Sequence, residues 1–408
     1  MRPSPYWKRY AVFSVGFVLL TTVVSFYTRI WVLTGAPVGF LFGFFLEKAD
    51  LCGASAFSEV VLSKDWDKLT GIWIVIVVSM LGFGLLSGLG LIKLNPKPLI
   101  WANMALGGVV FGVGMVLAGG CVSGSLFKTG QGNLNSMAAL VGIPLGVSAV
   151  EYGPLKGFNT ALKQYVVKSS EGGRVTLSSL TSLPYGVLAV GFAVLTMALV
   201  LITARRKKEA LTRKSEDLRE PVLQRILTRP WRPWQAGIAI GLLACFAYLS
   251  SAASGRNYPL GVTHGVMQAE LLVTDHPLKF VYTPKPSPAR EAGAVHSTGQ
   301  TSPYKKVSWW LVLEVTALVL GSFISARLSG KARLLSKPPD ETVVAFFGGV
   351  LVGVGAAIAG GCVVGNIMSG YALMSVGNLL FGAVVLLANW ATTHFYLMGG
   401  RIVVGQRE

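Results

Sequence analysis

The sequence predicts an all-α polytopic membrane protein with about nine transmembrane helices, re-entrant helical loops and an inverted internal repeat. Hydrophobic residues make up 52% of the chain and charged residues only 13%, a balance typical of proteins that have lipid as their solvent. Uncharged runs long enough to cross about 30 Å of hydrocarbon recur along the chain. The stretch from 343 to 400 contains no Asp, Glu, Lys or Arg. A glycine-rich motif occurs twice.

The apolar runs predict where the chain crosses the membrane. The first run has no clear small-residue cleavage site, so it is interpreted as a permanent span rather than a signal peptide. The predicted crossings are 10–29, 71–92, 99–118, 134–152, 183–204, 234–253, 308–328, 342–360 and 374–396.

Three stretches between these crossings have a different character. Between the first two crossings, 34–68 contains apolar pieces too short to span, punctuated by glycine, proline and acids, and we expect two short segments that dip into the membrane. The stretch 254–272 is broken in a similar way. Residues 274–306 are rich in proline, charge and Ser/Thr, which indicates an exposed loop.

The basic residues cluster beside the spans. The net charge is +18, and 205–232 carries ten Lys/Arg against four Asp/Glu, whereas the interleaved aromatics of a nucleic-acid-binding face are missing. Such an excess marks the cytoplasmic side and favours anionic lipid as a neighbour. Since five predicted crossings precede this linker, we expect the N-terminus outside and the C-terminus in the cytoplasm, although Lys8 and Arg9 then lie on the less favoured side.

The internal repeat divides the chain. Residues 107–124 match 348–365 at 12 of 18 positions, "GGVVFGVGMVLAGGCVSG" against "GGVLVGVGAAIAGGCVVG". An odd number of predicted crossings separates the copies, so the second is upside down, as in many membrane carriers. We therefore divide the chain into a first half-repeat at 1–204, a basic linker at 205–232 and a second, inverted half-repeat at 233–408.

Each copy contains a predicted break in a helix. The pairs Gly119–Gly120 and Gly360–Gly361 weaken a helix by about 2 kcal/mol relative to alanines. Irregular backbone at membrane depth is tolerated where protein or a water-filled path surrounds it. We expect Cys121 and Cys362 at the N-termini of short helices, where free amides favour an anion. Gly124 and Gly365, which close the repeated motif, complete this candidate site.

The other candidate residues follow from the broken segments. Cys52 occupies a broken segment of its own, and His264 lies in the broken segment of the second half, where it could donate to an anion or gate by protonation. Burial raises the pKa of a thiol and a helix N-terminus lowers it; a neutral thiol suits an anion, because S–H is a weak donor. Cys245 is interpreted as a core residue. Glu314 is an acid inside a span that is either functional or close to the interface.

Four segments together resemble the YeeE/YedE family of membrane proteins. They are "FLEKADLCGASAFSE" (45–59), "GGVVFGVGMVLAGGCVSGSLFKTGQG" (107–132), "GRNYPLGVTHG" (255–265) and "GGVLVGVGAAIAGGCVVGNIMSG" (348–370). The resemblance implies thiosulfate uptake through an hourglass-shaped path that four re-entrant loops constrict, in a bacterial inner membrane. It also implies that Cys52, Cys121 and Cys362 relay the ion without a lasting covalent bond, and that a small TusA-like sulfur-carrier protein binds on the cytoplasmic side.

The leading hypothesis is therefore an importer of an inorganic sulfur-containing anion, most simply thiosulfate. The chain shows no Walker, HExxH or GxSxG motif, so we expect neither an enzyme nor a cofactor, and no resident metal. Two alternatives stay open. Three converging thiolates would suit a soft-metal transporter of the Cu(I) type, and one activated cysteine would suit a membrane sulfurtransferase that forms a persulfide.

Overall fold

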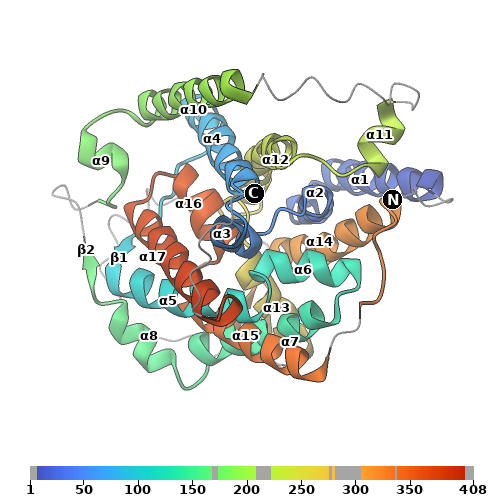
Figure 1. The fold of residues 1–408 in the computed structure, drawn as a ribbon. Helices are drawn as coiled ribbons and strands as arrows, with labels where there is room; N and C mark the ends of the chain where they lie inside the picture. The colour runs from blue at the N-terminus through green and yellow to red at the C-terminus, as the bar shows by residue number, and fades with distance from the viewer. Residues whose placement is uncertain are drawn as a thin grey trace.

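The computed structural model describes residues 7–167, 173–207, 222–274, 278–280, 305–335 and 338–399. The described chain is almost entirely helical, which confirms the predicted fold class (Figure 1). The first half contains α1 (Trp7–Thr28), η1 (Trp31–Thr34), α2 (Gly35–Ala49), α3 (Gly53–Leu62), α4 (Asp67–Gly88), α5 (Trp101–Leu117), α6 (Val122–Gln131), α7 (Leu134–Glu151), α8 (Lys156–Leu162), α9 (Leu177–Thr181) and α10 (Tyr185–Lys207). The second half contains α11 (Val222–Thr228), α12 (Pro233–Ala253), α13 (Val262–Thr274), α14 (Trp309–Leu328), α15 (Pro339–Ile358), the π-helix η4 (Val363–Met368), α16 (Ser369–Ala372), α17 (Val376–Thr392) and η5 (Thr393–Leu397).

The strands are very short. β1 (Leu99–Ile100) pairs antiparallel with β2 (Val166–Val167), and β3 (Leu278–Phe280) pairs parallel with β4 (Lys305–Val307). The predicted exposed loop at 274–306 lies mostly outside the described residues, as does the middle of the basic linker, 208–221.

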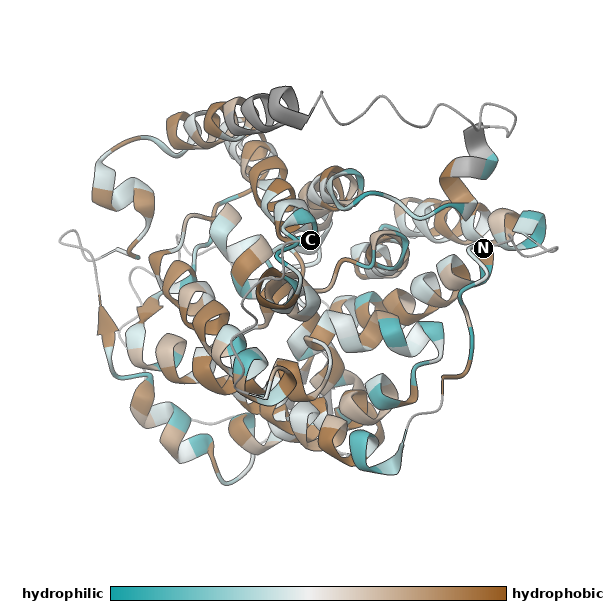
Figure 2. Ribbon diagram, in the orientation of Figure 1, coloured by the Kyte–Doolittle hydropathy of each residue, from teal (hydrophilic) through white to brown (hydrophobic). Residues whose placement is uncertain are grey.

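Nine helical segments in the described ranges are long and apolar enough to cross a membrane, and apolar residues predominate along most of the long helices (Figure 2). Eight of them correspond to predicted crossings, namely α1, α4, α5, α7, α12, α14, α15 and α17. The predicted crossing at 183–204 corresponds to α10, of which the apolar stretch Tyr185–Ala198 is shorter. The ninth segment, Trp31–Leu62, contains α2 and α3.

The expectation that 34–68 only dips into the membrane is wrong for α2. This helix lies along α14 from end to end: a Cβ on Gly35 would collide with the backbone of Trp310, one on Gly43 would collide with Leu318, and the Glu47 carboxylate accepts from the Ser325 hydroxyl at 2.5 Å. Glycines four residues apart allow this backbone contact. Since α14 is itself long enough to span, α2 crosses the membrane beside it.

The additional crossing reverses the expected position of the N-terminus. Helix α1 runs antiparallel to α2, with the Phe17 and Phe40 rings 5.1 Å apart and the Phe26 and Trp31 rings 5.2 Å apart. The first turn of α1 therefore lies at the end where α2 finishes, and Figure 1 shows α11 beside it. At the same end the backbone N–H of Trp231 donates to the Lys48 carbonyl at 2.8 Å.

We call this end the linker side and the opposite end the far side. The described parts of the basic linker and the start of α1 share the linker side, so the prediction that the N-terminus lies across the membrane from the linker is wrong. The C-terminal end of α17 lies there too, because the Trp390 indole donates to the Phe57 carbonyl of α3 at 3.1 Å. The loop at 93–97 and the start of α14 lie on the far side.

The two halves are related by pseudo-two-fold symmetry in their packing. Helix α2 packs on α14 as α12 packs on α4, and α7 packs on α15 as α17 packs on α5. Helices α5 and α15 meet at the centre and are antiparallel: a Cβ on Gly107 would lie 2.8 Å from the Gly355 carbonyl oxygen, and one on Gly114 would lie 2.6 Å from the Val352 nitrogen. The predicted inversion of the repeat is confirmed for these two helices.

The arrangement of the ends predicts a labelling pattern for three single-cysteine additions. In intact cells, a membrane-impermeant maleimide should discriminate Lys93→Cys on the far side from Lys8→Cys and Arg232→Cys on the linker side, since all three side chains are exposed. Mass spectrometry before and after permeabilisation measures the labelling, and the parent protein gives the background of the native thiols. Equal labelling of Lys8→Cys and Lys93→Cys in intact cells would contradict the assigned course of α1 and α2.

Candidate functional site

Three breaks in the helices share one local structure. Two positions before each of Cys52, Cys121 and Cys362, the backbone adopts the left-handed conformation. The residues are Asp50 with φ 47°, Gly119 with φ 65° and Gly360 with φ 68°. A left-handed residue ends an α-helix by redirecting the chain, and glycine adopts this conformation without strain. The prediction that the glycine pairs end α5 and α15 is confirmed. Asp50 does the same after α2, since a short polar side chain also tolerates this conformation.

The three cysteines begin the helices that follow. Cys52, Cys121 and Cys362 are the N-cap residues of α3, α6 and η4, all with extended backbone. None of the three helix starts is capped by a side chain. The cysteines are 0%, 0% and 1% exposed. Each break therefore presents a buried thiol beside first-turn amides that lack a side-chain acceptor, the arrangement that favours an anion at a helix N-terminus.

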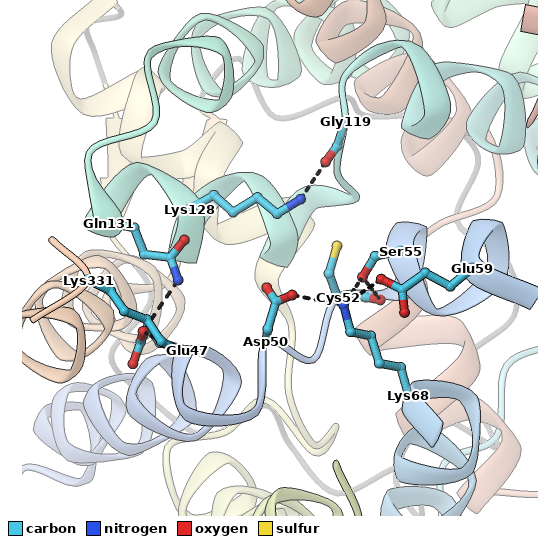
Figure 3. Close-up of polar contacts among 10 residues, drawn as sticks. All are labelled: Glu47, Asp50, Cys52, Ser55, Glu59, Lys68, Gly119, Lys128, Gln131 and Lys331. Carbon is cyan, nitrogen blue, oxygen red and sulfur yellow. Dashed lines mark hydrogen bonds and ion pairs between the residues drawn. The ribbon is translucent and has the colours of Figure 1, made fainter. Parts of the chain in front are cut away.

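Two of the thiols are in contact on the linker side of the centre. The side chains of Cys52 and Cys121 are close enough to interact directly. The Cys121 sulfur is also 3.4 Å from the Ser123 hydroxyl. Gly124 leaves room for the pair, because a Cβ there would collide with the Cys52 sulfur and lie 3.6 Å from the Cys121 sulfur. In Figure 3 the Cys52 sulfur points towards the segment that carries Gly119 and Lys128.

The third thiol opens on a cavity nearer the far side. Cys362 lines this cavity, which has a volume of about 220 Å³, and we call it the far-side cavity. His264 lines it as well, so the structure brings together two predicted site residues that are distant in sequence. The remaining lining residues are Lys97, Arg256, Tyr258, Leu260, Gly261, Val262, Thr263, Gly360, Gly361 and Gly365.

The helix starts that carry Cys52 and Cys362 are in contact. A Cβ on Gly53, the residue after Cys52, would lie 2.8 Å from the Cγ1 atom of Val363, the residue after Cys362. The starts of α3 and η4 therefore face each other across the Val363 side chain. The segment that carries Cys52 is therefore in contact with the segment that leads Cys362 into the far-side cavity.

Each break is held by a lysine that sequence reasoning missed. Lys128 donates to the Gly119 carbonyl at 2.7 Å and Lys97 to the Gly360 carbonyl at 2.6 Å. Lys68 donates to the Asp50 carboxylate at 2.8 Å (Figure 3). Lys68 also bonds Glu59 at 2.6 Å. Because the carbonyls at a helix end need donors, the lysines satisfy the breaks and bring positive charge close to all three cysteines.

Asn366 organises the second break. Its side-chain oxygen accepts from Lys97 at 2.6 Å, and its amide nitrogen donates to the carbonyls of Ala359 at 3.2 Å and Gly361 at 2.9 Å. The equivalent residue of the first copy is Ser125, whose buried hydroxyl has no hydrogen-bond partner among the described residues. The two copies therefore share a backbone but stabilise it differently.

The cavity's basic groups differ in charge at neutral pH. Burial lowers the pKa of Lys97 to about 8. The nearby Cys362 raises this pKa and the charge of Arg256 lowers it further. Burial, followed by the nearby charges of Lys97 and Arg256, lowers the pKa of His264 to about 4. His264 is therefore uncharged at neutral pH and acts as a hydrogen-bonding group. Lys97 and Arg256 supply the positive charge.

The two remaining candidates lie apart from the thiols. Cys245 is half-buried on α12, where its thiol donates to the Gly241 carbonyl at 3.3 Å and packs against Gly82 of α4. Glu314 is fully buried, and both of its oxygens are 3.3 Å from the Gly261 nitrogen at the start of α13. In the described part of the chain, no group of three or more His, Cys, Asp or Glu could hold a metal ion.

Comparisons with known proteins agree with this arrangement. A sequence model described as sulphur transport matches residues 48–391, which include all three breaks with cysteines. The chain is 29% identical over 371 residues to the thiosulfate transporter TsuA of Spirochaeta thermophila, covering 88% of this chain and 97% of that protein. It is 27% identical over 363 residues to TsuA of Escherichia coli, covering 89% and 94%. It is also 30% identical over 196 residues to the probable transporter YedE of Escherichia coli, covering 48% and 45%.

The repeat offers a matched pair of substitutions. Asn366→Ala removes one acceptor and two donated hydrogen bonds in a buried site, and should lower stability by about 2–4 kcal/mol. Ser125→Ala, at the equivalent position, removes a hydroxyl that makes no hydrogen bond and should leave stability within about 0.5 kcal/mol. Thermal unfolding of the purified proteins in detergent measures both. Equal melting temperatures for the two variants would show that Asn366 does not hold the break.

Proposed function

The chain belongs to the sulphur transport family, and we propose that it is a membrane transporter that imports an inorganic sulfur-containing anion, thiosulfate in particular. The observation that carries this proposal is the succession of three uncapped helix starts, each with a buried cysteine and a nearby lysine. Both relatives that align over nearly their whole length are named thiosulfate transporters.

The chemistry of the breaks suits an anion that leaves water. Its hydration shell must be replaced, and amide N–H groups, ammonium groups and thiols are all donors. An ion that enters the far-side cavity would meet Lys97 and the Cys362 thiol first. It would then pass the Val363 side chain to the Cys52–Cys121 pair. Since each thiol donates through S–H and is not consumed, the ion moves along the cysteines without a covalent bond.

The surroundings of the cysteines argue against a soft-metal cargo. Two thiols pair with each other and the third faces Lys97 and Arg256 across the far-side cavity. A Cu(I) ion would be repelled by these two cations, whereas an anion is attracted. A persulfide-forming sulfurtransferase needs a base beside its nucleophile. The Cys121 sulfur is 3.4 Å from the Ser123 hydroxyl, which is no such base, so this argument applies to Cys121 and not to Cys362, whose cavity also contains His264.

Charge on the linker side supports an inward direction of transport. Ten Lys/Arg between 205 and 232, together with Lys8 and Arg9 at the same end, favour the cytoplasm for the linker side of a bacterial inner membrane. Both termini are then cytoplasmic. The ion would enter at the far-side cavity and leave past Cys52 and Cys121. A TusA-like sulfur carrier would receive it there, and the half-repeats 1–204 and 233–408 would flank the path.

Substitution of the cysteines tests the relay. Cys121→Ser and Cys362→Ser replace a soft, weakly hydrated donor with a hard one and should each lower the uptake of radiolabelled thiosulfate at least about tenfold, since a loss of about 1.4 kcal/mol suffices. Cells that lack other importers supply the assay. Cys245→Ser is the control and should transport as the parent does. Unchanged uptake by both Cys121→Ser and Cys362→Ser would refute the relay.

Uptake should also depend on pH through Lys97. With a pKa of about 8, the charged fraction of this lysine falls from about nine-tenths at pH 7 to about one-tenth at pH 9. The anion loses an attractive partner as pH rises, so the KM for thiosulfate should increase several-fold over this interval. Proteoliposomes with the outer pH varied provide the measurement.

Lys97→Arg is the matched control for the pH dependence, because arginine stays charged throughout this range. Its KM should vary little between pH 7 and pH 9. An equal pH dependence in both proteins would assign the effect to another group and contradict the role of Lys97.

A further inference from the structure

The fourth break, before α13, differs from the other three. Gly261 precedes α13, at the position that cysteine holds before α3, α6 and η4. The Gly261 N–H already has an acceptor, because both carboxylate oxygens of Glu314 lie 3.3 Å from the Gly261 nitrogen. Glu314 comes from α14 and is 0% exposed. A carboxylate of the protein itself thus occupies the kind of helix start that elsewhere faces a thiol.

The same helix start also faces the far-side cavity. Gly261, Thr263 and His264 all line it. Thr263 is 2% exposed, and its buried hydroxyl has no hydrogen-bond partner among the described residues. An unpaired buried hydroxyl is costly unless a ligand engages it. The first turn of α13 therefore has a spare donor for an anion in the cavity, although the Gly261 amide already faces Glu314.

Arg256 connects Glu314 with the cavity. Its guanidinium donates to the Pro259 carbonyl at 2.8 Å and lies 5.2 Å from the centroid of the Trp310 ring, which fixes it beside the cavity. Burial disfavours the charged forms of Arg256 and Glu314, and their mutual attraction favours both charged forms. With His264 uncharged, the ionised forms of Lys97, Arg256 and Glu314 leave the cavity region with a single net positive charge.

We propose that Glu314 is a built-in counter-anion that weakens the far-side cavity's hold on the travelling anion, so that the ion is released towards Cys52 and Cys121. This inference rests on the proposed transport function. A conduction site must attract its ion and also let it leave. Two half-buried cations and a helix N-terminus without a counter-charge would bind an anion tightly and retain it. Glu314 does not touch the ion; it sets the field in which the ion binds.

The position of Glu314 is rigid enough for this role. A Cβ on Gly39 of α2 would collide with the backbone of Glu314, so α2 and α14 are in direct backbone contact at this level. On the other side of α14, a Cβ on Gly265 of α13 would lie 2.8 Å from the Leu311 carbonyl oxygen. The carboxylate is thus held between α2 and α13 at a fixed place in the membrane.

Glu314→Gln isolates the charge, because the amide oxygen can still accept from the Gly261 N–H. We expect the KM for thiosulfate to fall about tenfold or more, because a charge that repels the ion is removed. We expect the maximal uptake rate to fall as well, because release becomes slower. Glu314→Asp keeps the charge and should retain a KM within about threefold of the parent. Asp340→Asn, an exposed acid at the linker-side end of α15, removes one charge elsewhere and should change neither parameter.

The outcomes separate this inference from the transport function. A parent protein that takes up no thiosulfate contradicts the proposed function, whatever Glu314 does. A parent that transports, with a folded Glu314→Gln protein whose KM is unchanged or raised, overturns the counter-anion role alone. Size-exclusion chromatography and thermal unfolding report the fold. If the glutamine variant does not fold, Glu314→Asp decides the question, and a KM raised more than about threefold overturns the proposal.

Discussion

The structure depends on one constraint: a helix that stops inside a membrane leaves backbone groups that need partners. The carbonyls at the end of α5 and α15 and the amides at the start of α6 and η4 cannot turn to lipid, where each unpaired group costs several kcal/mol. Two lysines satisfy the carbonyls, because Lys128 donates to Gly119 and Lys97 donates to Gly360. The amides receive no side-chain cap. At each break the carbonyls of the helix that ends are therefore hydrogen-bonded, whereas the amides of the helix that begins are free to bind an anion.

Features that depend on neighbouring residues in the chain were predicted correctly from the sequence. Paired glycines before Cys121 and Cys362 predict that a helix ends and another begins, and the structure has both events at those residues. Eight spans follow from uncharged runs that are long enough to cross. The sequence misled us at α2, where Glu47, Lys48 and Asp50 interrupt an apolar run of modest length. These charges have partners in the fold: Glu47 lies 3.4 Å from Lys331, Asp50 lies 2.8 Å from Lys68, and Lys48 donates to the Leu227 carbonyl at 2.6 Å.

Other parts of the site could not be predicted from the sequence because their partners are distant in the chain. Lys97 follows α4 and lies outside the repeated motif, yet it bonds Gly360 and Asn366. No periodicity or spacing signals such a contact. Asp50 stands where the other breaks have glycine, so a search for glycine pairs does not find the first break. The one available signal was Lys128, which follows Cys121 by seven residues in a stretch poor in charge, whereas the stretch around Cys362 has no charged residue at all.

Duplication accounts for the backbone that the two breaks share. Divergence of the surrounding side chains accounts for the direction in which we propose the ion moves. The two copies bring the same break to opposite sides of the centre, but they surround it with different groups. The break at Cys362 opens on a cavity with Lys97 and Arg256, whereas the break at Cys121 lies against a second thiol, on Cys52. The fourth helix start has a glycine and a carboxylate instead of a cysteine. An ion that crosses would thus leave a cavity lined by Lys97 and Arg256 for a pair of thiols near Lys128 and near Lys68, which is itself paired with Asp50 and Glu59. Since fewer unpaired cations attract the ion there, the step towards the linker side loosens the hold on the ion and favours its release.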